Sequence, residues 1–384
     1  MARIPVLISA GEASGDMYAA QLAAALRRRF DVDLFGMGGQ RMRDAGVDTV
    51  VDCSEVGVLG VVEIVRKLPA LQRAWNRLIS EIDRRGPKLA ILTDFPAFHL
   101  RLSRVLRGKQ IRNVYFVCPQ FWAWRPWRVR LVKRRFARAL CIFPFEKDFY
   151  AEAGVQTDWI GHPLVDTVQS SETRDTFARR YGLNPALPII AVLPGSRPSE
   201  LTHHMPRLVR AIAQMTSKDQ RQFVFAMVPG LTQDQLKSRT SPLGSATTVV
   251  ENATYDLLGA ADIAIISSGT ATVEAALLGV PMVVIYRVAP FTAFVVRQLA
   301  RTKLFAMVNV LAGKEIVPEL IQDNFTHERL IQQTERLLNS LEARENMQRE
   351  LAKVRQMLGP PGAIERAADI IASMIQDKPT GTLH

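Results

Sequence analysis

Small and hydroxylated residues crowd one short stretch of this sequence, SSGTATVEAALLGVP at residues 267–281. The stretch lies between the apolar runs DIAII and MVVIY, so it joins the end of one expected strand to the start of an expected helix. Ser268 or Thr270 could cap that helix by accepting a hydrogen bond from a first-turn N–H group. Alternatively, Ser268, Gly269 and Thr270 let a phosphate reach the N–H groups at the positive end of the helix dipole.

Two charged side chains extend the second interpretation to a nucleotide diphosphate. Arg197 follows Gly195 and Ser196 in the loop LPGSR, after the apolar run IIAVL, and its guanidinium fork suits phosphate. Glu274 comes one helical turn after Thr270, too late for a capping box, and its carboxylate could accept hydrogen bonds from both ribose hydroxyls. A structural ion pair is the alternative role for Arg197. Together these residues predict a pocket for a nucleotide diphosphate.

The loop GEASGD, residues 11–16, is a candidate substrate-binding loop in the first half of the chain. It follows the apolar run IPVLISA, is small and flexible, and carries two carboxylates. Its candidate site residues are Gly11, Glu12, Ser14, Gly15 and Asp16. The alternative is that the glycines only permit a tight strand-to-helix turn and that Asp16 caps the helix.

A second loop of the first half offers a candidate general base. Asp94 ends the run KLAILTD and is followed by Phe95 and Pro96. A carboxylate at the carboxyl end of a buried strand is well placed to abstract a proton. An Asx turn or a helix cap is the alternative role for Asp94.

The elements that position these loops alternate between short apolar strands and helices. This pattern predicts parallel sheets covered on both faces. Two such series, joined by a polar connector near residues 166–187, predict an α/β protein of two Rossmann-like domains facing across a cleft. We expect an N-terminal domain at 1–165 and a C-terminal domain at 166–345. Helices at 346–384 are expected to pack back on the N-terminal domain.

Composition limits the class of protein and its partners. The chain has 49 Lys and Arg against 37 Asp and Glu, a net charge of +12, which favours an anionic partner. Three distant cysteines, Cys53, Cys118 and Cys141, are typical of reduced thiols in a cytoplasmic protein. No apolar run approaches the ~18 residues of a membrane-spanning helix. The sequence therefore predicts a cytoplasmic protein that is soluble or peripheral.

Several enzyme classes lack their motifs in this chain. G-x-x-x-x-G-K-[ST], G-x-S-x-G and H-E-x-x-H are absent, which excludes a P-loop NTPase and disfavours the serine hydrolases and zinc proteases. Asp31 and Asp33 form no convincing metal site, so neither a metal nor another cofactor is expected. RNA binding through WRPWRVRLVKRR is an alternative class of function. Trp122 and Trp124 precede that basic run, as a packed loop would, so we expect no nucleic-acid partner.

An amphipathic stretch at residues 56–77 is a candidate membrane-binding helix. Its apolar residues gather largely on one side at helical spacing, and Arg and Lys residues are interleaved with them, as in a helix among anionic headgroups. Pro69 is expected to kink or split the helix. A core helix is the alternative. The residues predicted to contact membrane and acyl chains are Val58, Val61, Val62, Val65 and Leu68.

Eight segments together resemble one known family in order and spacing, over about residues 5–370. They are AGEASGD, GVLGVVEIV, CPQFWAWR, FPFEKDFY, IGHPLVD, LPGSR, SSGTATVEAALLGVPMVVIYR and NVLAGKEIVPELIQ. The chain resembles the lipid-A-disaccharide synthase family, bacterial inverting glycosyltransferases of the GT-B fold. The resemblance implies transfer of 2,3-diacylglucosamine from UDP to the 6-hydroxyl of 2,3-diacylglucosamine 1-phosphate. The products would be a β(1→6)-linked disaccharide 1-phosphate and UDP.

The resemblance also assigns roles and partners. It implies that Asp94 is the base, that Arg197 stabilises the leaving UDP, and that Asn309 and Glu315 complete the donor pocket. It places the acceptor on loop 11–16 and the enzyme on the cytoplasmic face of the inner membrane. Whether the protein forms a homodimer is left open.

One stretch departs from the family's Asp-x-Pro-Asp-Phe-Asn pattern, because this chain has Ala97 and His99 where the family has the second Asp and the Asn. What these two residues contribute is left open. A UDP-sugar epimerase of similar architecture is the alternative function.

Overall fold

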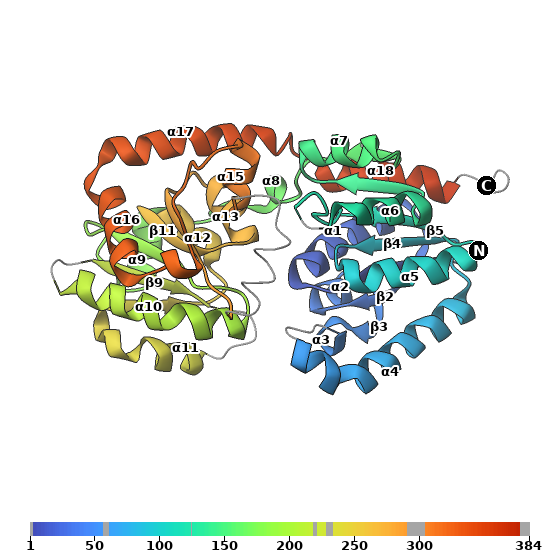
Figure 1. Cartoon of the computed structure of the whole chain (residues 1–384), viewed down its shortest axis with the longest axis horizontal. Coiled ribbons are helices and arrows are strands. Elements are labelled where there is room, and N and C mark those ends of the chain that lie inside the picture. Colours follow the sequence, from blue (N-terminus) through green and yellow to red (C-terminus); the bar gives the residue numbers. More distant parts are fainter. Residues whose placement is uncertain are drawn as a thin grey trace. The chain divides into compact units, whose positions relative to one another are not determined.

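The computed structural model describes residues 3–56, 61–123, 125–217, 221–227, 233–289 and 304–376, with only the backbone described for 61–68, 198 and 245–246. Its chain divides into two compact units (Figure 1). Unit 1 comprises Met1–Asp166 and Leu358–His384, and unit 2 comprises Thr167–Met357. Each unit contains one parallel sheet with helices between successive strands.

The sheet of unit 1 has the strand order β3-β2-β1-β4-β5-β6-β7. Every neighbouring pair is parallel, as expected for strands that alternate with helices. The strands are β1 (Ile4–Ala10), β2 (Val32–Gly38), β3 (Asp48–Asp52), β4 (Leu89–Thr93), β5 (Arg112–Phe116), β6 (Arg138–Cys141) and β7 (Thr157–Trp159). The helices are α1 (Ala13–Arg29), α2 (Gln40–Asp44), α3 (Cys53–Val56), α4 (Val61–Arg85), α5 (Pro96–Gly108), η1 (Pro126–Arg128), α6 (Val129–Arg135), α7 (Pro144–Glu152), α8 (Leu164–Thr167) and α18 (Ala363–Gln376).

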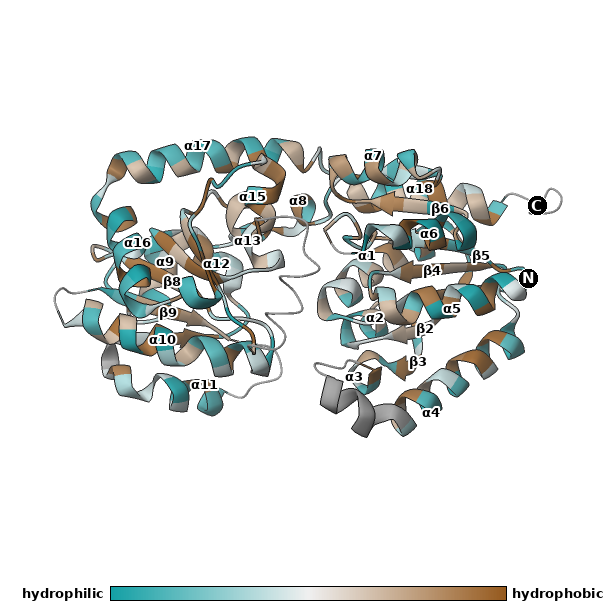
Figure 2. Ribbon diagram, in the orientation of Figure 1, coloured by the Kyte–Doolittle hydropathy of each residue, from teal (hydrophilic) through white to brown (hydrophobic). Residues whose placement is uncertain are grey.

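Successive side chains of these strands point to opposite faces of the sheet. Leu7, Leu92 and Tyr115 belong to a core that also contains Leu78 of α4, Leu106 of α5 and other buried residues of α5 and α6. Helix α18 packs on α1, which in turn contacts α2. Because strands buried on both faces read as continuous apolar runs, the central strands appear hydrophobic in Figure 2.

The sheet of unit 2 has the order β10-β9-β8-β11-β12-β13, again with parallel neighbours. Its strands are β8 (Ile189–Leu193), β9 (Gln222–Ala226), β10 (Thr247–Val250), β11 (Ile263–Ser267), β12 (Met282–Tyr286) and β13 (Glu319–Ile321). Its helices are α9 (Arg174–Arg180), α10 (Pro198–Thr216), α11 (Gln233–Thr240), η2 (Ser241–Ala246), α12 (Thr254–Ala260), α13 (Thr270–Leu277), α15 (Met307–Ala312), η3 (Gln322–Asn324), α16 (His327–Asn339) and α17 (Leu341–Met357).

Two local features bear on the sequence expectations. Helix α4 continues through Pro69 as one element, so the proline does not split it. Helix α17 contacts α13, α15 and α16 of unit 2, and the chain returns to unit 1 at Leu358, after the expected position 346. Within the parts of the chain that the structure describes, no helix has the length and apolar character needed to cross a bilayer.

Candidate functional site

The candidate loops of unit 2 leave neighbouring strands at the point where strand order reverses. Strand β8 pairs with β11, with Leu193 opposite Ile266, while β9 lies on the other side of β8. The loop 194–197 follows β8, and the loop 268–269 follows β11. In open parallel sheets, ligands bind beyond the carboxyl ends of the strands at such a switch point. The topology therefore brings Arg197 and the Ser268–Thr270 segment to one edge of one sheet.

Helix α13 begins without a side-chain cap. Its N-cap is Gly269, at φ +156°, so neither Ser268 nor Thr270 caps the helix. The Ser268 hydroxyl instead donates to the Phe305 carbonyl at 3.2 Å, and Thr272 Oγ1 donates to the Gly269 carbonyl at 2.8 Å. Gly269 and Thr270 are exposed, and a Cβ at position 269 would meet only open space. The start of α13, at Gly269 and Thr270, is thus presented to solvent at the switch point.

A buried hydroxyl lies directly before this turn. Ser267, the last residue of β11, is 6% exposed, and its Oγ finds no hydrogen-bond partner within the described parts of the chain. A buried polar group without a partner is costly, and such groups are rare in folded proteins. The edge therefore has an unused donor in addition to the start of the helix.

Glu274 lies half-buried one turn into α13. Its Oε1 accepts a hydrogen bond from Tyr255 Oη of α12 at 3.2 Å. This bond fixes one carboxylate oxygen and holds the side chain in place. Tyr255 carried no signal in the sequence, because nothing in its neighbourhood indicates which residue it will contact.

The loop after β8 is closed by Glu200, which the sequence analysis did not single out. Glu200 Oε2 accepts the Ser196 N–H at 2.9 Å, so that backbone donor is already used. Gly195 has φ +141°, and a Cβ there would lie 2.5 Å from the same oxygen, so the position requires glycine. Arg197 is the N-cap residue of α10 and is half-buried. Burial raises the pKa of Tyr286, Glu200 raises it further, and the nearby Arg197 opposes this shift.

A buried histidine ties this loop to the end of β12. His204 Nδ1 contacts the Pro194 carbonyl at 2.7 Å, and the Arg287 N–H donates to His204 Nε2 at 2.8 Å. A carbonyl can only accept, so Nδ1 carries the proton and the ring is neutral. Burial lowers the pKa of His204, which keeps the imidazole neutral. This histidine was not singled out from the sequence, and the structure places its side chain between the ends of β8 and β12.

Asn309 and Glu315 lie in the segment before β13. The buried Asn309 amide donates to the Val317 carbonyl and to Glu319, and its Oδ1 accepts from the backbone N–H groups of Ile316 and Val317. These bonds occupy the amide within the protein. Glu315 is exposed. Asn309 therefore shapes the loop that carries Glu315.

In unit 1 the candidate loops again flank the switch point, here between β1 and β4. Loop 11–12 follows β1, and Asp94 and Phe95 follow β4. Gly11 is buried, and the Phe95 ring lies against it. Helix α1 begins at Ala13 with no side-chain cap. The half-buried Glu12 and Ser14 lie at this start.

Asp16 plays a structural part that differs from the expected helix cap. Its carboxylate accepts the backbone N–H groups of Gly39, Arg41 and Met42 at 2.6 to 3.3 Å, and so caps α2, not its own helix α1. Asp16 is 5% exposed. Gly15 packs closely, with Thr93 and Ala10 at ordinary contact distance from a Cβ placed there.

Asp94 is held by its backbone in an unusual conformation. Asp94 and Phe95 have φ angles of +48° and +47°, which disfavour residues with a side chain. Phe95, not Asp94, is the N-cap of α5, and no side chain caps that helix. The Asp94 carbonyl accepts hydrogen bonds from Tyr115 Oη at 3.2 Å and from the imidazole of His99 at 2.7 Å. The Asp94 side chain is half-buried and lies at the carboxyl end of β4.

A buried acid near Asp94 was missed by the sequence analysis. Glu146 is fully buried at the start of α7, where it accepts from Trp122 Nε1 at 3.2 Å and from the Phe143 N–H at 3.3 Å. Burial raises the pKa of Glu146 to about 8, and the negative charge of Asp94 adds to that shift. Trp122 belongs to the motif CPQFWAWR and Glu146 to the motif FPFEKDFY, and the spacing of these motifs does not indicate that the two side chains meet.

The membrane prediction falls mainly outside what the structure describes. Val58 lies outside the described residues, and the side chains of Val61, Val62, Val65 and Leu68 are not described. Elsewhere in unit 1, Trp127 is 58% exposed, and the Arg128 guanidinium lies 5.5 Å from its ring centroid. Burial lowers the pKa of Arg128, and the neighbouring charge of Arg125 lowers it further.

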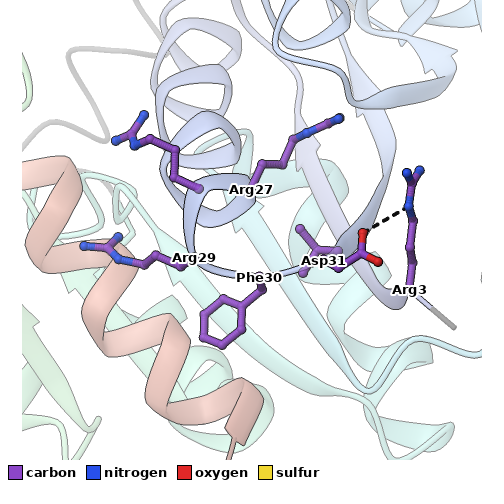
Figure 3. Close-up of a pocket in the computed structure, with 7 residues that line it drawn as sticks. Arg3, Arg27, Arg29, Phe30 and Asp31 are labelled. Atoms are coloured by element: carbon purple, nitrogen blue, oxygen red, sulfur yellow. Dashed lines mark ion pairs between the residues drawn. The ribbon is translucent and has the colours of Figure 1, made fainter. Parts of the chain in front are cut away.

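A pocket at the amino ends of β1 and β2 is separate from these loops (Figure 3). Its arginines are largely paired: Arg3 with Asp31, and Arg29 with Glu365 and Asp369 of α18. It lies at the edge of the sheet away from Asp94. Over the described ranges, no three His, Cys, Asp or Glu side chains group as metal ligands would.

Comparison with known proteins agrees with the family suggested by the motifs. A family model described as lipid-A-disaccharide synthetase matches residues 6–372. A lipid-A-disaccharide synthase of Myxococcus xanthus is 40% identical over 372 residues, covering 96% of this chain and 97% of that protein. The corresponding protein of Koribacter versatilis is 41% identical over 383 residues, covering 98% and 100%.

Solved structures with low identity share the fold. A UDP-GlcNAc 2-epimerase from Neisseria meningitidis bound to UDP-GlcNAc has a TM-score of 0.66 at 12% identity, covering 97% of this chain and 100% of that one. The calicheamicin glycosyltransferase CalG4 has a TM-score of 0.62 at 16% identity, covering 99% and 100%. The expected class, α/β with two Rossmann-like domains of the GT-B type, is confirmed.

Proposed function

The chain belongs to the lipid-A-disaccharide synthase family, and from this membership we propose the substrates of the reaction and the residues that perform it. It is a glycosyltransferase that uses a UDP-sugar. The donor is UDP-2,3-diacylglucosamine, and the acceptor is 2,3-diacylglucosamine 1-phosphate. The acceptor 6-hydroxyl oxygen attacks C1 of the donor sugar, the bond from C1 to the diphosphate breaks, and UDP leaves with the bonding electron pair.

The start of α13 is the observation that carries this proposal. With Gly269 as its N-cap, the helix starts without a side-chain cap, and Gly269 and Thr270 are exposed at the edge where β8 and β11 end. Backbone N–H groups and the positive end of the helix dipole stabilise a diphosphate there. Arg197, on the neighbouring loop, adds a permanent charge that becomes more favourable as UDP leaves. Glu274 accepts the ribose hydroxyls while Tyr255 fixes its orientation.

The remaining donor residues support this arrangement indirectly. Gly195 keeps the loop after β8 close to Glu200, and Ser196 offers its exposed hydroxyl, since its N–H is bound to Glu200. Asn309 holds the loop that presents Glu315.

Asp94 is the general base of the proposed reaction. It takes the proton of the acceptor 6-hydroxyl as the new C–O bond forms. Loop 11–16 binds the acceptor: Glu12 and Ser14 lie at the uncapped start of α1, Gly11 and Gly15 keep the loop compact, and Asp16 anchors it to α2.

The enzyme is proposed to act at the cytoplasmic face of the inner membrane. Both proposed substrates carry acyl chains, and the net charge of +12 favours an anionic surface. The exposed Trp127 and its neighbouring arginines suit a membrane interface, where an aromatic ring lies among headgroups. The stretch 58–68 would add apolar contacts.

One assay tests the reaction against the epimerase alternative. The full chain, in detergent, is incubated with both acylated substrates, and UDP and disaccharide are quantified by mass spectrometry. We expect UDP and disaccharide in equal amounts, with neither formed when the acceptor is omitted. In a parallel reaction with UDP-GlcNAc alone, a C2 epimer detected by NMR, together with no disaccharide in the first reaction, would replace this proposal by the epimerase.

A further inference from the structure

One buried histidine connects the first strand of unit 1 to the turn that carries Asp94. The His99 side chain, near the start of α5, is fully buried. Its Nδ1 lies 2.7 Å from the Asp94 carbonyl oxygen, and its Nε2 lies 2.9 Å from Ser9 Oγ of β1. Ser9 is also fully buried. The ring therefore bridges two elements that flank the switch point of the sheet.

The partners of His99 determine where its proton lies. The Asp94 carbonyl only accepts, so Nδ1 must donate, and Nε2 then accepts the Ser9 hydroxyl proton. Burial among the Phe95 and Phe98 rings lowers the pKa of His99 to about 4, which keeps the imidazole neutral. The orientation of the ring is thus fixed at both nitrogens.

The turn at Asp94 needs such a restraint. Two consecutive residues with side chains, Asp94 and Phe95, adopt left-handed φ angles. This conformation is unfavourable for residues with a side chain, so surrounding contacts must hold it. The Asp94 N–H donates to the Phe116 carbonyl at 3.3 Å, and its carbonyl accepts from Tyr115 and His99. The His99 bond is the shortest of these three.

We infer that His99, supported by Ser9, is a positioning residue that fixes the backbone turn of Asp94 and so aims its carboxylate at the acceptor hydroxyl. This inference rests on the proposed role of Asp94 as general base. It also gives a function to a position at which the chain departs from the family's asparagine. The imidazole reaches both the Asp94 carbonyl and the Ser9 hydroxyl, which lie on opposite sides of the ring.

Three substitutions test the inference in the full chain. His99→Phe keeps a ring but removes both nitrogens, so we expect turnover to fall roughly 10- to 100-fold, as for a small misplacement of a catalytic group. The KM values of both substrates and the affinity for UDP should stay within about twofold. His99→Asn keeps an amide donor for the Asp94 carbonyl and should recover much of the lost turnover. Ser9→Ala should give an intermediate loss.

Controls separate positioning from general damage to the fold. Ser103→Ala removes another buried hydroxyl of α5, which donates to the Leu100 carbonyl of the same helix, and should leave turnover unchanged. In an Asp94→Asn background, His99→Phe should have no further effect on turnover if it acts through Asp94. Should His99→Phe fail to fold, His99→Asn and Ser9→Ala carry the test.

Three outcomes would overturn the inference, and they are distinguishable. Slow turnover in Asp94→Asn together with wild-type turnover in His99→Phe and Ser9→Ala would overturn the role of His99 and leave the base assignment intact. Wild-type turnover in Asp94→Asn would instead overturn the base assignment, and the role of His99 with it. Equal losses for His99→Phe in the wild-type and Asp94→Asn backgrounds would also reject positioning through Asp94.

Discussion

The Phe95 ring lies so close to Gly11 that a methyl group at position 11 would come within 2.3 Å of two ring carbons. This contact joins the loop after β1 to the loop after β4, the two loops at the switch point of unit 1. Because Phe95 itself has a left-handed φ, the packing against Gly11 helps to fix the turn. The loop proposed to bind the acceptor and the proposed base are therefore structurally coupled.

The first prediction concerns the proposed base. Asp94→Asn keeps the shape of the side chain but removes its basicity, so turnover should fall roughly 10²–10⁴-fold while UDP affinity is retained. Steady-state kinetics and calorimetry with UDP measure the two effects. Asp83→Asn, an exposed aspartate of α4, is the matched control and should behave as wild type. Near-normal turnover in Asp94→Asn would remove the assignment.

The second prediction concerns Arg197. Its charge is expected to stabilise the diphosphate more strongly as UDP leaves, so Arg197→Ala should lower turnover roughly 10²–10³-fold and also weaken donor binding. Arg210→Ala, which truncates an exposed arginine of the same helix α10, should change neither. A rise in KM with unchanged turnover would show instead that Arg197 binds the ground state and the transition state equally.

The third prediction concerns ribose binding by Glu274. Glu274→Ala removes a charged acceptor, and bonds to charged groups contribute about 1.5–3 kcal/mol, so UDP affinity should fall roughly 10- to 100-fold. Tyr255→Phe removes the hydroxyl that donates the 3.2 Å bond to the carboxylate and should give a smaller loss. Calorimetry with UDP measures both, with the exposed Glu251→Ala as control. Unchanged affinity in Glu274→Ala would exclude it from the site.

The strand-end loops could be predicted from sequence because their signal is local. Short apolar runs followed by Gly, Ser, Asp or Arg identify the carboxyl ends of strands, and parallel topology brings those ends to one edge. Loops 11–16, 194–197 and 267–270 and Asp94 were found in this way. The structure decided one question that the local pattern left open, since Gly269 is the N-cap of α13 and no hydroxyl caps it.

The residues that hold the loops could not be predicted, because their partners are distant in sequence. Ser9 meets His99 across 90 positions, Trp122 meets Glu146 across 24, and Arg287 meets His204 across 83. A buried polar side chain must find a partner, but the sequence does not say which one. Asp16 shows the same limit, since its carboxylate bonds α2, 23 to 26 positions away, and not the start of its own helix.

The fourth prediction concerns the membrane surface. Trp127→Ser should weaken binding to vesicles of anionic phospholipid several-fold, because an exposed indole contributes favourably at the bilayer interface. Leu341→Ser is the matched control, since Leu341 is 61% exposed against 58% for Trp127 but lies on α17 of unit 2, beside Glu342. Co-sedimentation measures binding. Equal binding of wild type and Trp127→Ser would place the membrane contact elsewhere.

The last prediction concerns Glu146 and the pH dependence of stability. Its pKa is raised from 4.5 to about 8 by burial, so between these values the folded protein holds a proton that the unfolded chain has lost. The free energy of unfolding should therefore fall as pH rises through this window, by up to about 1.4 kcal/mol per pH unit. Glu146→Gln mimics the protonated acid and lacks this dependence, so it should gain stability relative to wild type between pH 5 and pH 7.5.

Comparing the two proteins isolates this contribution from the histidines, which act in the opposite direction. Burial lowers the pKa values of His99 and His162 to about 4 and 3, so they reduce stability only as pH falls below about 6.5, and they do so equally in wild type and variant. All five tryptophans, Trp75, Trp122, Trp124, Trp127 and Trp159, lie in unit 1, so their fluorescence during urea unfolding reports on the unit that contains Glu146. Glu152→Gln, an exposed acid of the same helix α7, should parallel wild type at every pH. A difference between wild type and Glu146→Gln that stays constant from pH 5 to 7.5 would mean that Glu146 is ionised in the folded protein, held by Trp122 and the Phe143 N–H despite the charge of Asp94.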